Sequence, residues 1–177
     1  MASDVGVAVN LSPVQVRRLD LCQIVSDALA HSGLAAGRLE LEITESVLLR
    51  DQESTLETLR QLRALGVRLS MDDFGTGYSS LNYLRKFPFD KIKIDCCFVK
   101  DLWARRDSRA IIRAVTQLAS SLGMKTTAEC VETQSDLDFL KHVGCTEGQG
   151  YLFSKAVPAK EVCALLERQG VRTKAVA

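Results

Sequence analysis

The chain has 177 residues, 46% of them hydrophobic, with 23 lysines and arginines against 22 aspartates and glutamates. A net charge of +1 gives no field that would collect a nucleic-acid polymer or an anionic membrane. No apolar run approaches the ~20 residues of a membrane helix and the N-terminus lacks a signal-peptide pattern, so we expect a cytoplasmic protein. We expect one globular domain over residues 1–170 and a tail at 171–177.

The six cysteines show no metal-binding pattern. None of them forms a paired CxxC spacing, so a zinc site has no support. The adjacent Cys96 and Cys97 could not easily bridge to each other. We therefore expect reduced thiols throughout.

Six times along the chain, a short apolar segment is followed by a polar residue and then by a helical segment. The predicted strands are Val5–Val9, Leu39–Ile43, Val67–Met71, Lys91–Ile94, Lys125–Ala128 and Gly148–Phe153. The predicted helices run from Pro13 to about Ser32, from Gln52 to Leu65, from Ser79 to Lys86, after Asp107 through Leu122, after Thr133, and from Pro158 to about Gln169. Between Asp95 and Asp107 we expect irregular structure.

Helix start and stop signals support several of these boundaries. Ser12 and Pro13 suit the N-cap and first helical position, and Thr133 with Asp136 has capping-box spacing. Gly33 and Gly66 are expected to end helices.

The alternation of strands and helices, with connections too long for hairpins, predicts parallel strands joined by right-handed crossovers. An open doubly wound sheet and a (β/α) barrel both satisfy this pattern. Polar residues follow all six strands, and a barrel brings every strand end around one mouth, whereas an open sheet has one ligand crevice. The distribution favours an incomplete TIM-like α/β barrel with these end residues: Asn10, Glu42, Asp72, Asp73, Asp95, Glu129 and Gln149.

The segment MDDFGTGYSSL, from Met71 to Leu81, contains two adjacent aspartates and then a glycine-rich turn. Neighbouring carboxylates repel each other, and a cation relieves that repulsion. The alternative is an ordinary turn in which Asp73 caps the next segment and Asp72 is solvated.

Five carboxylates and two amides at one barrel mouth favour a hard cation bound through oxygen ligands, Mg²⁺ or Mn²⁺ rather than Zn²⁺. Such a site suits two-metal hydrolysis of a phosphate ester, with Lys93 orienting a water or meeting a phosphate oxygen. Taken singly, Asn10 could cap a turn, Glu42 could be solvated and Lys93 could lie at a sheet edge. No motif of nucleotide triphosphatases, dinucleotide-dependent enzymes or serine hydrolases is present.

Six motifs in one order resemble the EAL domain, a bacterial cyclic di-GMP phosphodiesterase. They are VNLSP at 9–13, ELEITES at 40–46, DDFGTGYSSL at 72–81, KIKID at 91–95, AECVET at 128–133 and QGYLF at 149–153. The resemblance implies a modified TIM barrel, Mg²⁺ or Mn²⁺, and hydrolysis of cyclic di-GMP to linear pGpG.

The resemblance also implies residue roles. Asn10, Glu42 and Asp72 resemble metal ligands, and Asp73 a ligand or water-holder for a second metal. Lys93 and Asp95 resemble the pair that organises the nucleophilic water, and Glu129 a general base or water-positioning carboxylate. Gln149 resembles an outer metal contact, and Glu45 and Glu132 the carboxylates that brace the loop after the aspartates.

Two departures from the family pattern matter. Cys130 replaces a glycine, and a side chain there could crowd the loop or shift Glu129. We expect a tolerated substitution, and the alternative is a reactive, redox-sensing Cys130. The family's first strands, with their metal-binding glutamate, have no counterpart here, so we expect impaired activity and open edges at Val5–Val9 and Tyr151–Phe153. Those edges predict a homodimer or another association. The alternative function is a non-catalytic module that binds cyclic di-GMP or a protein partner, and regulatory domains in a longer parent protein are compatible with either.

Overall fold

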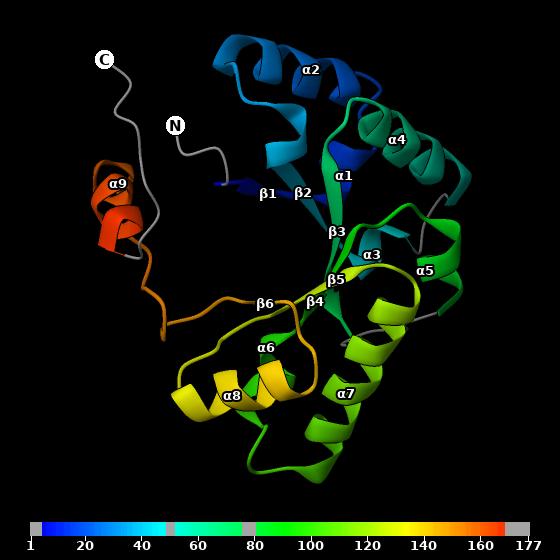
Figure 1. Ribbon diagram of the computed structural model, residues 1–177. Coiled ribbons are helices and arrows are strands. Elements are labelled where there is room, and N and C mark those ends of the chain that lie inside the picture. The colour runs from blue at the N-terminus through cyan, green and yellow to red at the C-terminus, as the bar shows by residue number, and fades with distance from the viewer. Residues whose placement is uncertain (1–4, 49–51, 76–80, 169–177) are drawn as a thin grey trace.

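The computed structural model describes residues 5–48, 52–75 and 81–168. Its centre is a six-stranded parallel sheet in which neighbours in sequence are neighbours in space, in the order β1 to β6. The strands are β1 (Val7–Leu11), β2 (Leu39–Thr44), β3 (Arg68–Phe74), β4 (Lys91–Ile94), β5 (Lys125–Ala128) and β6 (Glu147–Gly148). Figure 1 shows that the sheet curls rather than lying flat.

Helices cover the outer side of this curled sheet (Figure 1). The longer helices of the chain are α2 (Leu21–Ser32), α4 (Gln52–Ala64), α7 (Arg106–Ser121), α8 (Gln134–His142) and α9 (Ala159–Arg168). The shorter ones are α1 (Pro13–Val16), the 3₁₀ helix η1 (Ala36–Arg38), α3 (Glu45–Leu48), α5 (Leu81–Lys86) and α6 (Cys96–Lys100). Helix α9, in which no residue is buried, lies apart from the other helices.

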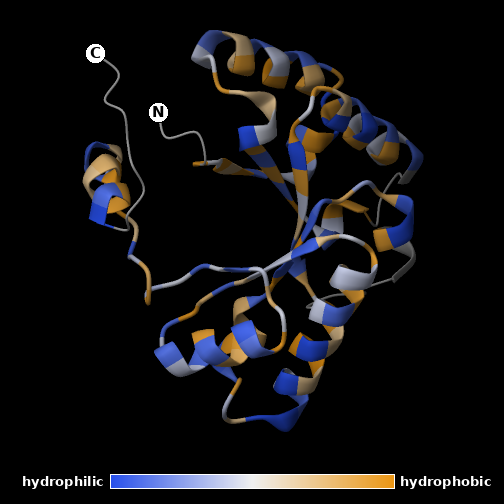
Figure 2. Ribbon diagram, in the orientation of Figure 1, coloured by the Kyte–Doolittle hydropathy of each residue, from blue (hydrophilic) through white to orange (hydrophobic). Residues whose placement is uncertain are grey.

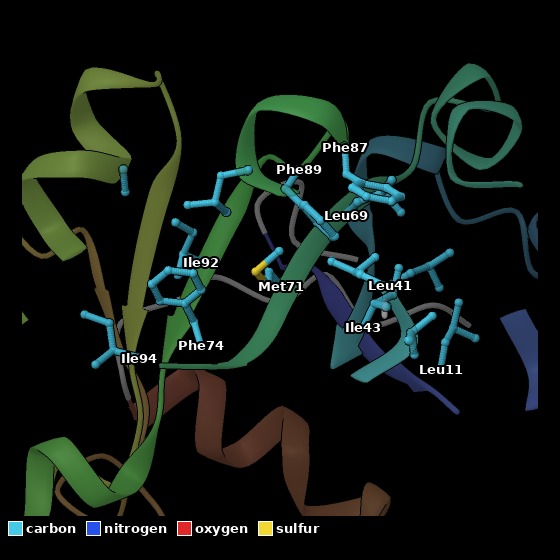
Figure 3. Packing of buried hydrophobic residues seen from close by; sticks show 14 of the residues in the cluster. Leu11, Leu41, Ile43, Leu69, Met71, Phe74, Phe87, Phe89, Ile92 and Ile94 are labelled. Atoms are coloured by element: carbon cyan, nitrogen blue, oxygen red, sulfur yellow. The ribbon is translucent and has the colours of Figure 1, made fainter. Parts of the chain in front are cut away.

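Because successive side chains of a strand point to opposite faces, one face of the sheet is apolar and the other is polar. Leu41 and Ile43 of β2, Met71 of β3 and Ile92 and Ile94 of β4 are almost fully buried in one core. Figure 3 shows these side chains gathered along neighbouring strands of the sheet. The residues between them are polar and face the concave side, so the helices pack on one face and the other is left for polar chemistry.

The covering helices have the mixed character that this arrangement requires. Figure 2 shows hydrophobic and hydrophilic residues interleaved along α4 and α7. Leu59 and Leu62 of α4 and Ile112 and Ala119 of α7 are fully buried, whereas their neighbours along the helix reach solvent. These helices are stabilised by burying one face against the sheet.

The predicted strand–helix alternation and its parallel order are confirmed. Strands β4 and β5 have the predicted bounds. Helix α4 begins at the predicted residue and ends one residue earlier than predicted. The capping boxes at Ser12 and Thr133 are both formed, with Gln15 and Asp136 as their partners. The sheet is therefore that of a TIM-like half-barrel, as expected, and not an open doubly wound sheet.

Several details of the prediction were wrong. Strand β1 spans Val7–Leu11 and not Val5–Val9, and β3 continues to Phe74 instead of ending at Met71. The predicted helix from Pro13 to Ser32 is two helices, α1 and α2, because the chain turns at residues 17–20. The stretch after Asp95 is not irregular, because the Asp95 side chain accepts a hydrogen bond from Cys97 N and starts α6. The sixth strand has two residues, Glu147 and Gly148, and a turn replaces the rest, so Tyr151–Phe153 is not an edge strand.

The aspartate pair lies inside the end of β3, where the pairing with β4 shifts between Met71 and Phe74. Asp73 has φ 55°, in the left-handed region. Gly75 follows with φ 97°, and a Cβ there would approach Phe98 to 2.9 Å, so a residue without a side chain is required. Residues 76–80, the rest of the glycine-rich turn, lie outside the described residues, as does the predicted tail at 171–177.

Among the described residues, none of the helices combines the length and apolarity needed to cross a membrane. Strand β1 pairs only with β2 there, and β6 only with β5. The described sheet therefore has two free edges, as the sequence predicted for its first strand.

Candidate active site at the carboxyl ends of the strands

Lys93 of β4 is the centre of the polar face. Its Nζ lies 2.7 Å from Glu42 Oε2 of β2, 3.0 Å from Asp72 Oδ1 of β3 and 2.8 Å from Glu129 Oε1, the residue after β5. Only 5% of the Lys93 side chain is exposed. One ammonium group thus holds carboxylates from β2, β3 and the end of β5, which rules out a solvated Glu42, and β4 lies inside the sheet, which rules out an edge position for Lys93.

These ion pairs keep Lys93 charged. Burial by itself would lower the pKa of Lys93, but the hydrogen bonds to Glu129, Glu42 and Asp72 outweigh it and raise the pKa above its usual value. The lysine is therefore a permanent cation at neutral pH. It cannot act as a general base, but it can orient carboxylates and donate to an oxygen atom.

Asp72, Asp73 and Glu129 form the densest carboxylate group. One oxygen from each lies within 4.8 Å of the others. Burial raises the pKa of Asp73, and the neighbouring Asp72 and Asp95 raise it further. Burial also raises the pKa of Glu129, with Asp72 and Glu42 adding to the effect and Lys93 opposing it. The group therefore carries more negative charge than Lys93 neutralises, and its oxygen donors fit a hard divalent cation.

Two other predicted site residues, Asn10 and Asp95, lie near this group. Asn10 is paired in register with Glu42 on the neighbouring strand and is exposed. Asp95 is close enough to Asp73 to affect its pKa, while its Oδ1 accepts a hydrogen bond from Cys97 N at 2.9 Å. Burial would raise the pKa of Asp95, but the bonds from Cys97 lower it, so this carboxylate is ionised.

A cavity of about 270 Å³ opens beside Glu129. Glu132 and Gln149 line it, together with Lys100 and Tyr151, which were not predicted as site residues. Glu45 is buried at the start of α3. The predicted bracing of the loop after the aspartates by Glu45 and Glu132 involves residues 76–80, which lie outside the described part of the chain.

The model of the EAL domain family matches residues 1–156. This chain belongs to the EAL domain family. The curled sheet agrees with solved EAL domains, since the complex of the MucR phosphodiesterase of Pseudomonas aeruginosa with c-di-GMP aligns with a TM-score of 0.86 and 42% identity, covering 90% of this chain and 65% of that one.

Two further comparisons extend this result. An uncharacterized protein of Sinorhizobium fredii, y4lL, is 55% identical over 92% of this chain and 20% of its own length. The BlrP1 protein of Klebsiella pneumoniae, solved as manganese and as calcium complexes with cyclic di-GMP, aligns with a TM-score of 0.79 and 34% identity, covering 85% of this chain and 38% of that one. The chain spans about a fifth to a quarter of the length of the curated relatives it matches.

A disulfide in this EAL domain contradicts the prediction that all its cysteines are reduced. Cys96 and Cys130 are bonded, with their Cα atoms 5.2 Å apart, while Cys22, Cys97 and Cys145 are free, as is Cys163. The reason is strand register: Ile94 of β4 pairs with Ala128 of β5, and each bonded cysteine lies two residues beyond its strand partner. The sequence did contain one signal of this pairing, because each of the two cysteines directly follows a predicted site carboxylate.

The sequence interpretation also missed a second layer of ion pairs on the concave face. Lys91, two residues before Lys93, binds Glu40 at 2.8 Å and also Glu147, which in turn lies 3.2 Å from Lys125. The alternation of charged and apolar residues in β2 and β4 could have indicated that Glu40 and Lys91 share a face. Their pairing with Glu147 depends on the order of the strands.

Proposed function

We propose that this EAL domain is a Mg²⁺- or Mn²⁺-dependent phosphodiesterase that hydrolyses cyclic di-GMP to linear pGpG. The observation that carries the proposal is the group of Asp72, Asp73 and Glu129, whose oxygens lie within 4.8 Å of one another at the strand ends. The names of MucR as a cyclic di-GMP phosphodiesterase and of the BlrP1 manganese complex support the same substrate and cofactor class.

Asp72 and Asp73 would hold the metal from the end of β3, with Glu42 and Asn10 completing the ligands from β2 and β1. When bound, a divalent cation supplies positive charge beside the scissile phosphate and makes a water molecule more acidic. Lys93 fixes the rotamers of Glu42, Asp72 and Glu129 through its three ion pairs. The carboxylates are thereby held in place before substrate arrives, which reduces the reorganisation that the reaction requires.

Glu129 is the proposed proton acceptor. The pKa of its carboxylate is raised by burial, which moves it toward the range in which a carboxylate accepts a proton from water effectively. Lys93 and Asp95 orient the attacking water, and Gln149 supports the metal ligands from the cavity wall. Hydrolysis adds this water to phosphorus and breaks one phosphodiester bond, which leaves a 5′-phosphate and a 3′-hydroxyl.

The alternative is a non-catalytic EAL module that binds cyclic di-GMP or a protein partner. One observation favours it: among the described residues, Glu42 does not belong to the compact group of Asp72, Asp73 and Glu129. A ligand set divided in this way would hold a nucleotide through fewer metal contacts. In that case cyclic di-GMP binds without being hydrolysed.

A turnover assay separates the two functions. Cyclic di-GMP is incubated with the chain and Mn²⁺ or Mg²⁺, and pGpG is measured by chromatography alongside binding by calorimetry. Asp72→Asn is expected to abolish pGpG formation, and Asp138→Asn, at an exposed position on α8, to leave it unchanged. Because the chain spans part of its relatives, the assay includes a version extended upstream. Binding without turnover in both versions would establish the non-catalytic module.

We also propose that the chain forms a homodimer through its free sheet edge at β1. Val7 and Val9, the register partners of Leu39 and Leu41, are 47% and 42% exposed there, so apolar side chains lie uncovered beside the unpaired backbone of this strand. Light scattering tests this, with Val9→Lys expected to give a monomer. A monomeric wild-type chain at micromolar concentration would rule the interface out.

Regulatory domains in a parent protein and the cytoplasmic location stay predictions.

A further inference from the structure

The disulfide between Cys96 and Cys130 joins the two strand ends that carry Asp95 and Glu129. These cysteines are 34 residues apart in sequence and follow the register partners Ile94 and Ala128. Cys130 directly follows Glu129, whose Oε1 is 2.8 Å from Lys93 Nζ. The covalent link is therefore one residue away from a carboxylate of the proposed site on each strand.

The backbone at Cys130 has the conformation that a side chain disfavours. Its φ is 54°, in the left-handed region where glycine is the usual residue. Two hydrogen bonds flank it: Glu129 N donates to Ile94 O at 3.2 Å, and Val131 N donates to Gln149 O at 3.0 Å. In the bonded state the link to Cys96 adds a covalent restraint to these two bonds. Without that link, relaxation of residue 130 toward negative φ relieves backbone strain and so lowers the free energy, and Glu129 moves with it.

The bond is open to attack. Cys130 lines the cavity of about 270 Å³ that it shares with Glu129, Glu132 and Gln149, and both bonded cysteines are partly exposed. The neighbouring thiol of Cys97 does not compete, because burial, with the charge of Asp95 adding to it, raises the pKa of Cys97 to about 11 and keeps the thiol protonated. An external dithiol can approach Cys130 from the cavity that this residue lines.

We propose that the Cys96–Cys130 disulfide is a reversible thiol switch that positions Glu129 and so sets the affinity of the Asp72–Asp73–Glu129 group for a divalent cation. The inference concerns the regulation of the proposed active site and rests on the proposed metal binding there. The oxidised chain is the high-affinity form, and the reduced chain is the low-affinity form. Both cysteines are positioning residues, which act through Glu129 and not on the substrate.

The reduction step balances with a dithiol as the partner. A thiolate of the dithiol attacks Cys130 Sγ and forms a mixed disulfide, while the bond to Cys96 breaks and Cys96 leaves as a thiolate that takes up a proton. The second thiol of the reductant then displaces Cys130. The protein gains two electrons and two protons in total, and the dithiol becomes a cyclic disulfide.

The test begins with the redox state of the whole chain. Thiols are counted in denaturant, with four expected in the chain purified without reductant and six after treatment with dithiothreitol. The reductant is then removed without oxygen, and Mn²⁺ affinity is measured by calorimetry for both states. We expect affinity about tenfold weaker after reduction, the size of effect that loss of ligand support produces. Six thiols before reduction, or equal affinities, would overturn the proposal.

Two single variants separate positioning from a merely structural role. Cys96→Ser removes the bond but leaves a side chain at φ 54°, so its affinity should be low with or without dithiothreitol. Cys130→Gly also removes the bond but restores a residue that accepts this φ, so its affinity should stay near that of the oxidised chain and ignore the reductant. Cys163→Ser, at a free and exposed thiol, should respond to reduction as the wild type does. High affinity in Cys96→Ser would contradict the switch.

Hydrogen exchange at the amides of Glu129 and Val131 provides a readout that needs no metal. Exchange should be faster after reduction of the wild type, faster in Cys96→Ser, and unaffected by dithiothreitol in Cys130→Gly. If these amides move on reduction but neither state binds Mn²⁺, the proposed metal site is wrong and the switch is overturned as a control of metal affinity. If Mn²⁺ binds but the amides do not respond, the switch alone is wrong.

Discussion

Lys91 and Lys93 lie two residues apart on β4 and face the same concave side of the sheet, but their charge environments differ. Lys91 binds Glu40 and Glu147, and Glu147 also binds Lys125, so two lysines meet two carboxylates. Lys93 alone meets three carboxylates, with Asp73 close by. The Lys91 set, which we call the lower layer, consists of Lys91, Lys125, Glu40 and Glu147 and is balanced in charge. The Lys93 set, which we call the upper layer, consists of Lys93, Glu42, Asp72, Asp73 and Glu129 and keeps an excess of negative charge.

The difference separates a structural network from a binding site. A balanced set of ion pairs needs no further ion and contributes only to folding, whereas an excess of buried carboxylate is costly until a cation joins it. The pKa values follow the same division. Burial would raise the pKa of Glu147, but Lys91 and Lys125 lower it, while burial raises the pKa of Glu129 despite Lys93.

The largest effect is expected from removing Lys93. Lys93→Met leaves three carboxylates facing one another with little solvent, and should lower the free energy of unfolding by about 3–5 kcal/mol. Lys91→Met should cost about 2 kcal/mol less, because Glu147 keeps Lys125. Urea unfolding measures both, and Mn²⁺ should restore stability in Lys93→Met only. Equal losses in the two variants would remove the distinction between the layers.

Metal affinity should follow the upper layer and not the lower one. Glu42→Gln is expected to weaken Mn²⁺ binding about 10–100-fold, because it changes a proposed ligand held by Lys93. Glu40→Gln, on the same strand and face but beside Lys91, is the matched control and should leave the affinity unchanged. Calorimetric titration of oxidised protein measures both. A comparable loss in Glu40→Gln would mean that the cation does not bind at the strand ends.

The two layers should respond to pH with opposite signs. The pKa of Glu147 is lowered from its ordinary 4.5, so its stabilisation is present above that value and is lost as the pH falls through the folded-state pKa. The pKa of Glu129 is raised from the same value, so its contribution is greatest below 4.5 and declines as the pH rises. Between about pH 3 and about pH 7, stability should therefore rise less in Glu147→Gln than in wild type, and more in Glu129→Gln.

Urea midpoints across this range measure the effect. Because 36% of the Glu147 side chain is exposed, solvent limits its contribution to about 1 kcal/mol or less. The same slope in both variants would contradict the assignment of opposite charge environments.

The smallest effect is expected at Ser70, which lies between the layers as the register partner of Glu42 and of Lys91. Its hydroxyl is buried, and within the described ranges no hydrogen-bond partner reaches it. Ser70→Ala should change stability by less than about 0.5 kcal/mol, since no partner is left unsatisfied. Thr116→Val removes a buried hydroxyl that donates to Ile112 O at 2.8 Å and should cost about 1 kcal/mol. A large loss in Ser70→Ala would indicate a polar network joining the layers.

Much of the fold was predictable because its signals are local. The apolar run of β4, the helical spacing in α7 and the capping box at Thr133 each depend on residues within a few positions. The end of the sixth strand was not predictable, because Gly148 and Gln149 read as strand while the backbone turns at Gly150 to pack closely against Val131. Tertiary contact overrode local propensity there.

The candidate site was likewise predictable in part, where its signals are local, and missed where they depend on tertiary contacts. Asp72, Asp73, Lys93 and Glu129 were predicted to share one end of the sheet, and the structure brings them together. The disulfide was missed because Cys96 and Cys130 become neighbours only through the pairing of β4 with β5. The ligand roles themselves stay predictions.

By itself, the sequence determined which side chains share a face of each strand, since the direction of a side chain alternates with every residue. It thereby determined that carboxylates and lysines line one side and aliphatic residues the other. Only the tertiary structure decided which of them meet: the register of β2, β3, β4 and β5 assigned three carboxylates to Lys93 and two to Lys91. The physical reason is that orientation is set by the local backbone, while charge balance depends on distances between strands that are remote in sequence.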